Sequence, residues 1–81
     1  MPIDTLRDKI DRVDARIVRL LEERVGLAKK IGAAKRKKGL NIENPEREAD
    51  VLRNVARDTK LNKKFVKSVF EEIIKYCRDN E

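Results

Sequence analysis

Apolar residues recur every three or four positions along the first half of the chain, from about residue 4 to residue 38. This spacing places them on one face of a helix. The residues on this face are Leu6, Ile10, Val13, Ile17, Leu20, Leu27, Ile31 and Ala34. The pattern predicts one long amphipathic helix, with Asp4 as its N-cap and Gly39 just beyond its end.

Two shorter helical patterns follow. Asn44 and Pro45 are typical of a helix start, an N-cap followed by a proline at the first helical position, and predict a helix over about residues 45–58. Asn62 is the expected N-cap of a third helix over about residues 63–80. The positions at core spacing are Glu48, Val51, Leu52, Val55 and Ala56 in the second helix, and Phe65, Val66, Val69, Phe70, Ile73, Ile74 and Cys77 in the third. With no strand pattern and no repeat, the sequence predicts one all-α domain spanning residues 1–81.

The predicted first helix is too long to be covered by the rest of one chain. About 34 helical residues span roughly 50 Å, whereas a compact domain of about 80 residues is nearer 30 Å across. A second copy of the chain can cover the apolar face that is left over. We therefore expect an intertwined homodimer of three-helix protomers.

Composition narrows the possible functions. The 81 residues carry 21 Lys and Arg against 15 Asp and Glu, a net charge of +6 that suits an anionic partner. The absence of His removes the usual acid–base residue at neutral pH, and the single Cys77 excludes an internal disulfide and a cysteine-based zinc cage. No metal site is expected. The chain shows neither a signal core nor a run of about 18 apolar residues, so we expect a cytoplasmic protein.

One residue interrupts the apolar face of the first helix. Arg24 occupies a step at which the pattern calls for an apolar residue, with Leu20, Leu21, Leu27 and Ala28 one turn away. A guanidinium in such a seam is costly without an anionic partner. Two interpretations stay open: a structural ion pair with a glutamate of the chain, Glu23 or Glu48, or a ligand site.

Other polar residues share the inner faces. Lys35 follows Arg24 by close to three full turns, so both project from one side of the helix. Glu48 and Glu81 place carboxyl groups on the inner faces of the second and third helices, while Arg7 lies about 100° around the first helix from Arg24. Each residue alone has an ordinary reading as a solvated or frayed side chain. Together they predict a site for a small dianion with a hydroxyl group, where catalysis depends on positioning and electrostatics.

Four blocks of sequence resemble the all-helical, AroQ-class chorismate mutases. They are Leu6-Arg7-Asp8-Lys9-Ile10-Asp11, Leu20-Leu21-Glu22-Glu23-Arg24, Ile31-Gly32-Ala33-Ala34-Lys35 and Asn44-Pro45-Glu46-Arg47-Glu48. The resemblance covers essentially the whole chain. It implies an intertwined dimer with two active sites that converts chorismate to prephenate by a Claisen rearrangement, in phenylalanine and tyrosine biosynthesis. It also implies that no cofactor and no covalent intermediate take part.

The resemblance assigns roles by position. Arg24 would bind a substrate carboxylate in its own chain, and Arg7 would reach in from the other protomer. Lys35 would contact a carboxylate and the ether oxygen whose bond breaks. Glu48 would hold the ring hydroxyl, with help from the backbone near Asn44, and Arg47 would line the same region. A cation at the ether oxygen meets negative charge that grows in the transition state.

Two positions depart from the commonest family pattern. Cys77 stands where many members have a small hydroxyl residue, and it is a weaker hydrogen-bond partner. Glu81 stands where many members have a glutamine that donates to the ether oxygen. An ionised glutamate cannot donate a hydrogen bond. Our hypothesis is that Glu81 acts as the neutral acid, which makes activity higher at mildly acidic pH.

Three alternative functions remain. An isochorismate–pyruvate lyase on the same fold would use a similar cationic pocket. A basic nucleic-acid-binding module would use the surface cations Lys35, Arg36, Lys37, Lys38, Lys60, Lys63, Lys64 and Lys67, although the chain has few aromatic residues for base stacking. A non-catalytic dimerisation module would not need Arg24. A larger pathway enzyme is a further possible partner.

Overall fold

The first helix, α1, occupies nearly half of the chain. In the computed structural model, which describes residues 1–81, α1 spans Ile3–Lys37. Gly39, at φ +70°, then turns the chain in the left-handed region. The Leu40 amide donates to the Lys35 carbonyl at 2.8 Å, and the Gly39 amide donates to the Arg36 carbonyl at 3.1 Å. These bonds satisfy carbonyls of the last turn and end the helix.

The beginning of α1 differs from the prediction. Pro2 is the N-cap, it makes no side-chain capping bond, and Asp4 lies inside the first turn. The prediction that Asp4 caps the helix is therefore wrong. Because α1 starts at Ile3, the Asp4 carboxylate instead lies beside the positive end of the helix dipole.

The other two helices start at the expected asparagines. Helix α2, Pro45–Arg57, follows Asn44, whose side-chain oxygen accepts from the Arg47 amide at 3.1 Å. Helix α3, Lys63–Asp79, follows Asn62, whose side-chain oxygen accepts from the Phe65 amide at 3.0 Å. Both bonds satisfy an amide that the helix itself leaves unpaired. The all-α prediction is confirmed.

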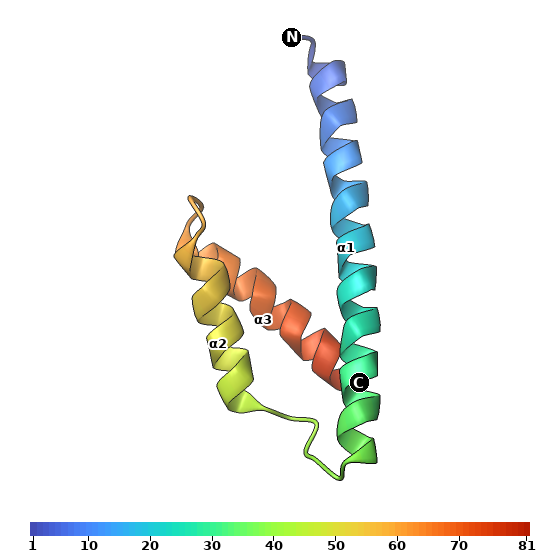
Figure 1. The fold of residues 1–81 in the computed structure, drawn as a ribbon. Helices are drawn as coiled ribbons and strands as arrows, with labels where there is room; N and C mark the ends of the chain where they lie inside the picture. Colours follow the sequence, from blue (N-terminus) through green and yellow to red (C-terminus); the bar gives the residue numbers. More distant parts are fainter.

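Helix α3 connects the other two helices. It packs against both α1 and α2, whereas no Cα atom of α1 lies within 8 Å of a Cα atom of α2. Figure 1 shows α3 running diagonally from the α2–α3 turn to α1, with the C-terminus against the second half of α1. The small buried core accordingly draws on all three helices: Ala28, Gly32, Ala56, Val66, Ile74 and Cys77.

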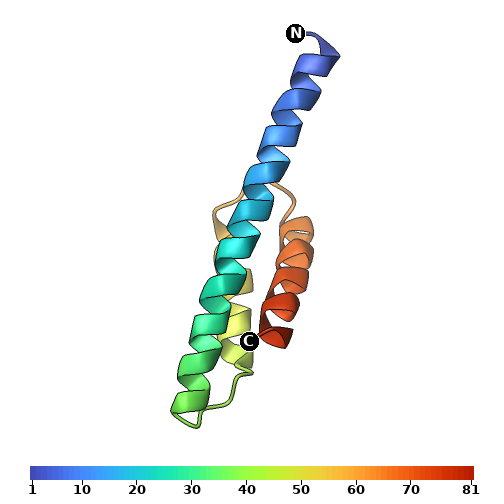
Figure 2. The ribbon, with the colours of Figure 1, turned by 90° about the vertical axis from the view of Figure 1, so that its right-hand side faces the viewer.

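The first half of α1 extends beyond the other helices. Figures 1 and 2 show it projecting past the α2–α3 turn, and the molecule measures 55 × 23 × 16 Å. The apolar face predicted from the sequence is thus largely uncovered in one chain, with Ile10 58% and Leu20 64% exposed. Phe65 and Val69, both expected in the core, are also 58% and 40% exposed, so those two predictions are wrong for the single chain. None of the three helices combines the length and apolar character that a membrane span requires.

Candidate functional site

A cavity of about 280 Å³ lies where residues of all three helices and of the α1–α2 connection meet. It contains seven of the eight residues that the sequence singled out: Arg24, Lys35, Asn44, Arg47, Glu48, Cys77 and Glu81. Apolar side chains, Leu27, Ile31, Val51 and Ile74 among them, form the rest of its wall. The cavity therefore combines apolar walls with converging cations, as ligand sites commonly do.

Arg24 is anchored to helix α3. Its Nη1 donates to the Cys77 Sγ at 2.9 Å, and Cys77 is only 3% exposed. The ion pair of Arg24 with a glutamate, one of the two interpretations above, is not formed. A sulfur is a weak acceptor, so the guanidinium is oriented without being neutralised. Its charge remains for an anion in the cavity.

Lys35 points back over the α1–α2 connection. Its Nζ donates to the Ile42 carbonyl oxygen at 2.9 Å. An ammonium has three donors, so this bond positions Lys35 and leaves further donors for a ligand. Because Lys35 is in the last turn of α1 and Ile42 follows the Gly39 turn, the chain reversal itself brings the ammonium to the cavity.

Glu48 has a partner that sequence reasoning missed. The Arg78 Nη1 of α3 donates to the Glu48 Oε1 at 2.9 Å and to its Oε2 at 3.2 Å. Arg78 also lines the cavity. A signal was available, since Arg78 lies one turn beyond Ile74 on the inner face of α3. With Arg78, the cavity holds four cationic side chains and two carboxyl groups.

Glu81 reaches the cavity through a close approach to α1. A Cβ added to Gly32 would lie 2.7 Å from the Glu81 backbone oxygen and 2.8 Å from its Cβ. The guanidinium of Arg36, one turn further along α1, donates to the same backbone oxygen. The side-chain Oε2 of Glu81 is buried and has no hydrogen-bond partner. Gly32 thus permits the close approach of Glu81, and Arg36 anchors its backbone. The side chain of Glu81 then places an unpaired oxygen in a buried position.

Arg7 is the predicted site residue that the single chain does not bring to the cavity. It lies 17 positions before Arg24 on the same helix, which separates their backbones by about 26 Å along the axis. No bend in α1 shortens this path, as Figure 2 shows. Within a single chain, Arg7 therefore lies outside the cavity.

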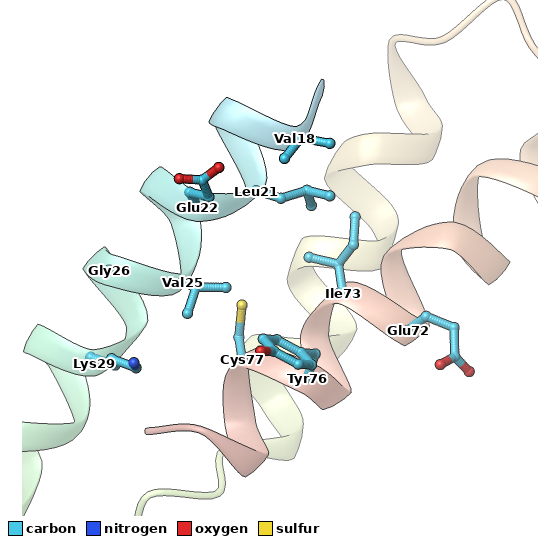
Figure 3. A pocket seen from close by; sticks show the side chains of 10 residues that line it. All are labelled: Val18, Leu21, Glu22, Val25, Gly26, Lys29, Glu72, Ile73, Tyr76 and Cys77. Carbon is cyan, nitrogen blue, oxygen red and sulfur yellow. The ribbon is translucent and has the colours of Figure 1, made fainter. Parts of the chain in front are cut away.

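A second groove lies on the other side of the α1–α3 contact. Its volume is about 660 Å³, and it is mainly apolar: Figure 3 shows Val18, Leu21 and Val25 facing Ile73 and Tyr76. Lys29 is the one cation among its lining residues, alongside Glu22 and Glu72. This groove lacks the paired cations that a small dianion requires. The smaller, cationic cavity is the better candidate site.

The cationic cavity can fix the geometry of an anion and stabilise charge. Arg24 and Lys35 both have donors left for carboxylate oxygens, and charge-assisted hydrogen bonds of this kind are strong. No three Cys, Asp or Glu side chains of residues 1–81 are placed so that together they could hold a metal ion. The residues in the cavity are suited to binding and orienting a dianion.

Known proteins with related sequences and the same fold identify the family of this chain. The model of the family described as chorismate mutase type II matches residues 6–81, nearly the whole chain. The chain belongs to the chorismate mutase type II family. A solved structure of the chorismate mutase of Thermus thermophilus (Form I) has the same fold, with a TM-score of 0.89 and 32% sequence identity over 93% of this chain and 96% of that one. The fold and the family thus agree.

Two relatives extend the comparison within the chorismate mutases. The chorismate mutase of Methanocaldococcus jannaschii is 31% identical over 74 residues, which are 88% of this chain and 75% of that protein. The bifunctional chorismate mutase/prephenate dehydratase of Aquifex aeolicus is 46% identical over 67 residues, 83% of this chain. This chain spans only 18% of that Aquifex protein. The same domain therefore occurs within a longer polypeptide in that relative.

Proposed function

We propose that this protein is a chorismate mutase, which rearranges chorismate to prephenate in phenylalanine and tyrosine biosynthesis. The observation that carries the proposal is the convergence of Arg24, Lys35 and Glu48 on one small cavity in a member of this family. Chorismate is a dianion with a ring hydroxyl, and these three side chains offer two cations and one hydroxyl acceptor. The Aquifex relative, whose name includes prephenate dehydratase, is consistent with this pathway.

The reaction requires no proton transfer. Within one molecule, the ether C–O bond breaks while a new C–C bond forms, and the two carboxylates persist throughout. Arg24 binds one carboxylate and Lys35 contacts the other together with the ether oxygen. Holding the flexible substrate in its reactive conformation removes entropy from the barrier, and a fixed cation stabilises charge that develops on the ether oxygen.

The remaining cavity residues complete the site. Glu48 accepts a hydrogen bond from the ring hydroxyl, and the backbone near Asn44 helps to bind the same hydroxyl. Arg47 lines this region, and Cys77 orients Arg24 through the sulfur contact. Glu81, as the neutral acid, donates a second hydrogen bond to the ether oxygen beside that of Lys35.

We further propose that the active unit is a homodimer with shared sites. The single chain has an accessible surface of 6844 Å², whereas a compact protein of its mass exposes about 5,000 Å². Its radius of gyration is 15.9 Å, against about 12 Å for a compact chain of this length. An excess of roughly 1,800 Å² per chain matches what obligate dimers bury. An antiparallel second α1 on this face would bring the partner subunit's Arg7 to the cavity.

The direct test is to incubate the purified protein with chorismate between pH 5 and 8, and to follow chorismate loss and prephenate formation. A parallel incubation with isochorismate, monitored for pyruvate release, separates the mutase from the lyase on the same fold. Turnover of isochorismate but not of chorismate would reject the proposal in favour of the lyase. Turnover of neither, together with salt-dependent binding to duplex DNA, would favour the nucleic-acid-binding module.

The role proposed for Glu81 predicts a pH dependence. As the pH rises, ionisation of Glu81 removes its O–H donor and places a negative charge beside the ether oxygen. We expect kcat/KM to fall by about tenfold or more between pH 5 and 8. The other charged groups that line the cavity are Arg24 and Lys35 of α1, Arg47 and Glu48 of α2, and Arg78 of α3.

The matched variant is Glu81→Gln, which donates at every pH. Its pH–rate profile is expected to be flat where that of the unmodified protein falls. A flat profile for both proteins would show that Glu81 does not act as the neutral acid.

Two glycines of α1 offer a paired test of how Glu81 is held. Gly32→Ala places a methyl group against Glu81, so we expect Glu81 to move out of the site and kcat/KM to fall by about tenfold. Gly26→Ala meets no atom within 4 Å. It should leave activity unchanged and raise the stability by about 1 kcal/mol through helix propensity. Equal activities of the two variants, measured alongside thermal unfolding, would contradict the importance of the Gly32 contact.

A further inference from the structure

We infer that Arg78 is a positioning residue that orients Glu48 for the ring hydroxyl of the substrate and keeps Glu48 away from the substrate-binding cations. The inference rests on the proposed function and adds a residue to it. Arg78 was not among the site residues predicted from the helical spacing or implied by the family resemblance. The contact that carries the inference joins α2 to α3 inside the cavity.

The Arg78–Glu48 pair differs from every other ion pair in the chain. The remaining pairs join residues at most three positions apart, and each includes a side chain that is at least half exposed: Arg53–Asp50, Arg57–Asp58 and Arg78–Asp79. Arg78 and Glu48 are 30 positions apart and their side chains are only 31% and 26% exposed. Exposed ion pairs contribute little to the stability of a protein. The Arg78–Glu48 pair is partly buried and lines the cavity, so it can act on a ligand bound there.

The geometry of the pair fixes the carboxylate. One nitrogen, Nη1, lies 2.9 Å from Oε1 and 3.2 Å from Oε2, so it bridges both oxygens and restrains rotation of the carboxylate plane. A carboxylate has about four lone-pair positions. Each carboxylate oxygen therefore keeps a free lone pair that can accept a hydrogen bond from the ring hydroxyl of a substrate in the cavity.

Arg78 also separates the charges of the site. Arg24 and Lys35 line the same cavity as Glu48, so an unpartnered Glu48 carboxylate would turn toward them and neutralise a cation that the substrate needs. In the structure, Arg24 contacts the Cys77 sulfur and Lys35 contacts the Ile42 carbonyl, while Glu48 is held by Arg78. The pairing therefore keeps two cations available for the two carboxylates of the substrate.

The test compares two substrates in Arg78→Gln. One is chorismate, and the other is the chorismate analogue in which hydrogen replaces the ring hydroxyl. We expect kcat/KM for chorismate to fall by about 10- to 100-fold, the effect of losing one charge-assisted hydrogen bond. For the analogue, which makes no bond to Glu48, the change should stay within about threefold. Arg78→Lys, which restores a cation, should recover part of the loss.

Controls separate this role from a purely structural one. Arg53→Gln removes an exposed ion pair within α2 and should leave both substrates unaffected. If Arg78→Gln lowers kcat/KM equally for both substrates, or lowers only the melting temperature, Arg78 does not act through Glu48 on the hydroxyl and the inference is wrong. If the unmodified protein converts neither compound, the proposed function fails and the inference falls with it.

Discussion

Replacing Lys35 with methionine is expected to lower kcat/KM for chorismate by about 10³-fold, the effect of losing a preorganised donor to developing negative charge. Lys35 is proposed to contact both a carboxylate and the ether oxygen, so the loss should appear mainly in kcat. Methionine keeps most of the side-chain stem, which limits the change to the charge and its bond to the Ile42 carbonyl. Steady-state kinetics with chorismate measure the effect.

Lys38→Met is the matched control. Lys38 is one turn further along, is outside the cavity and is exposed. It should have unchanged kinetics, and circular dichroism should show both variants folded. Activity of Lys35→Met within tenfold of the unmodified protein would reject the assignment of Lys35 to the ether oxygen.

Mixing two inactive variants is expected to restore activity. In the proposed dimer each site combines Arg24 of one chain with the partner subunit's Arg7. Arg7→Ala and Arg24→Ala should therefore each lose at least about 100-fold in kcat/KM. In a dimer that contains one chain of each, one site has both arginines and the other has neither. After refolding an equimolar mixture, about a quarter of all sites should be intact.

A second mixture provides the control. Arg24→Ala combined with Lys35→Met damages the same wall of the cavity in both chains, so neither site of the mixed dimer is complete. No activity should return. Recovery in this control, or no recovery in the Arg7→Ala and Arg24→Ala mixture, would contradict a site shared between two subunits.

Local signals in the sequence predicted much of the fold. Asn44 and Asn62 cap their helices because a cap depends on the next three residues alone. The separation of Arg24 and Lys35 by close to three helical turns also predicted that they share one side of α1, and both line the cavity. The prediction that Asp4 caps α1 is wrong because a sequence pattern locates the end of a helix only to within one or two residues.

Contacts between helices could not be deduced in the same way. The Arg78–Glu48 pair depends on how α3 crosses α2, which helical spacing does not specify. The same is true of the Arg24–Cys77 contact, where one interpretation of the sequence was an ion pair of Arg24 with Glu23 or Glu48. Phe65 has core spacing but lies exposed, since spacing identifies a face and not the element that covers it.

The uncovered first half of α1 affects how the stability and activity of this protein should depend on its concentration. In the proposed dimer, each chain completes its core and its binding site only by pairing, so the melting temperature should depend on protein concentration. Its turnover per milligram should likewise decline when an assay is diluted below the dissociation constant of the pair. The activity would then be lost by dissociation alone, without any change in the amino-acid sequence of the site.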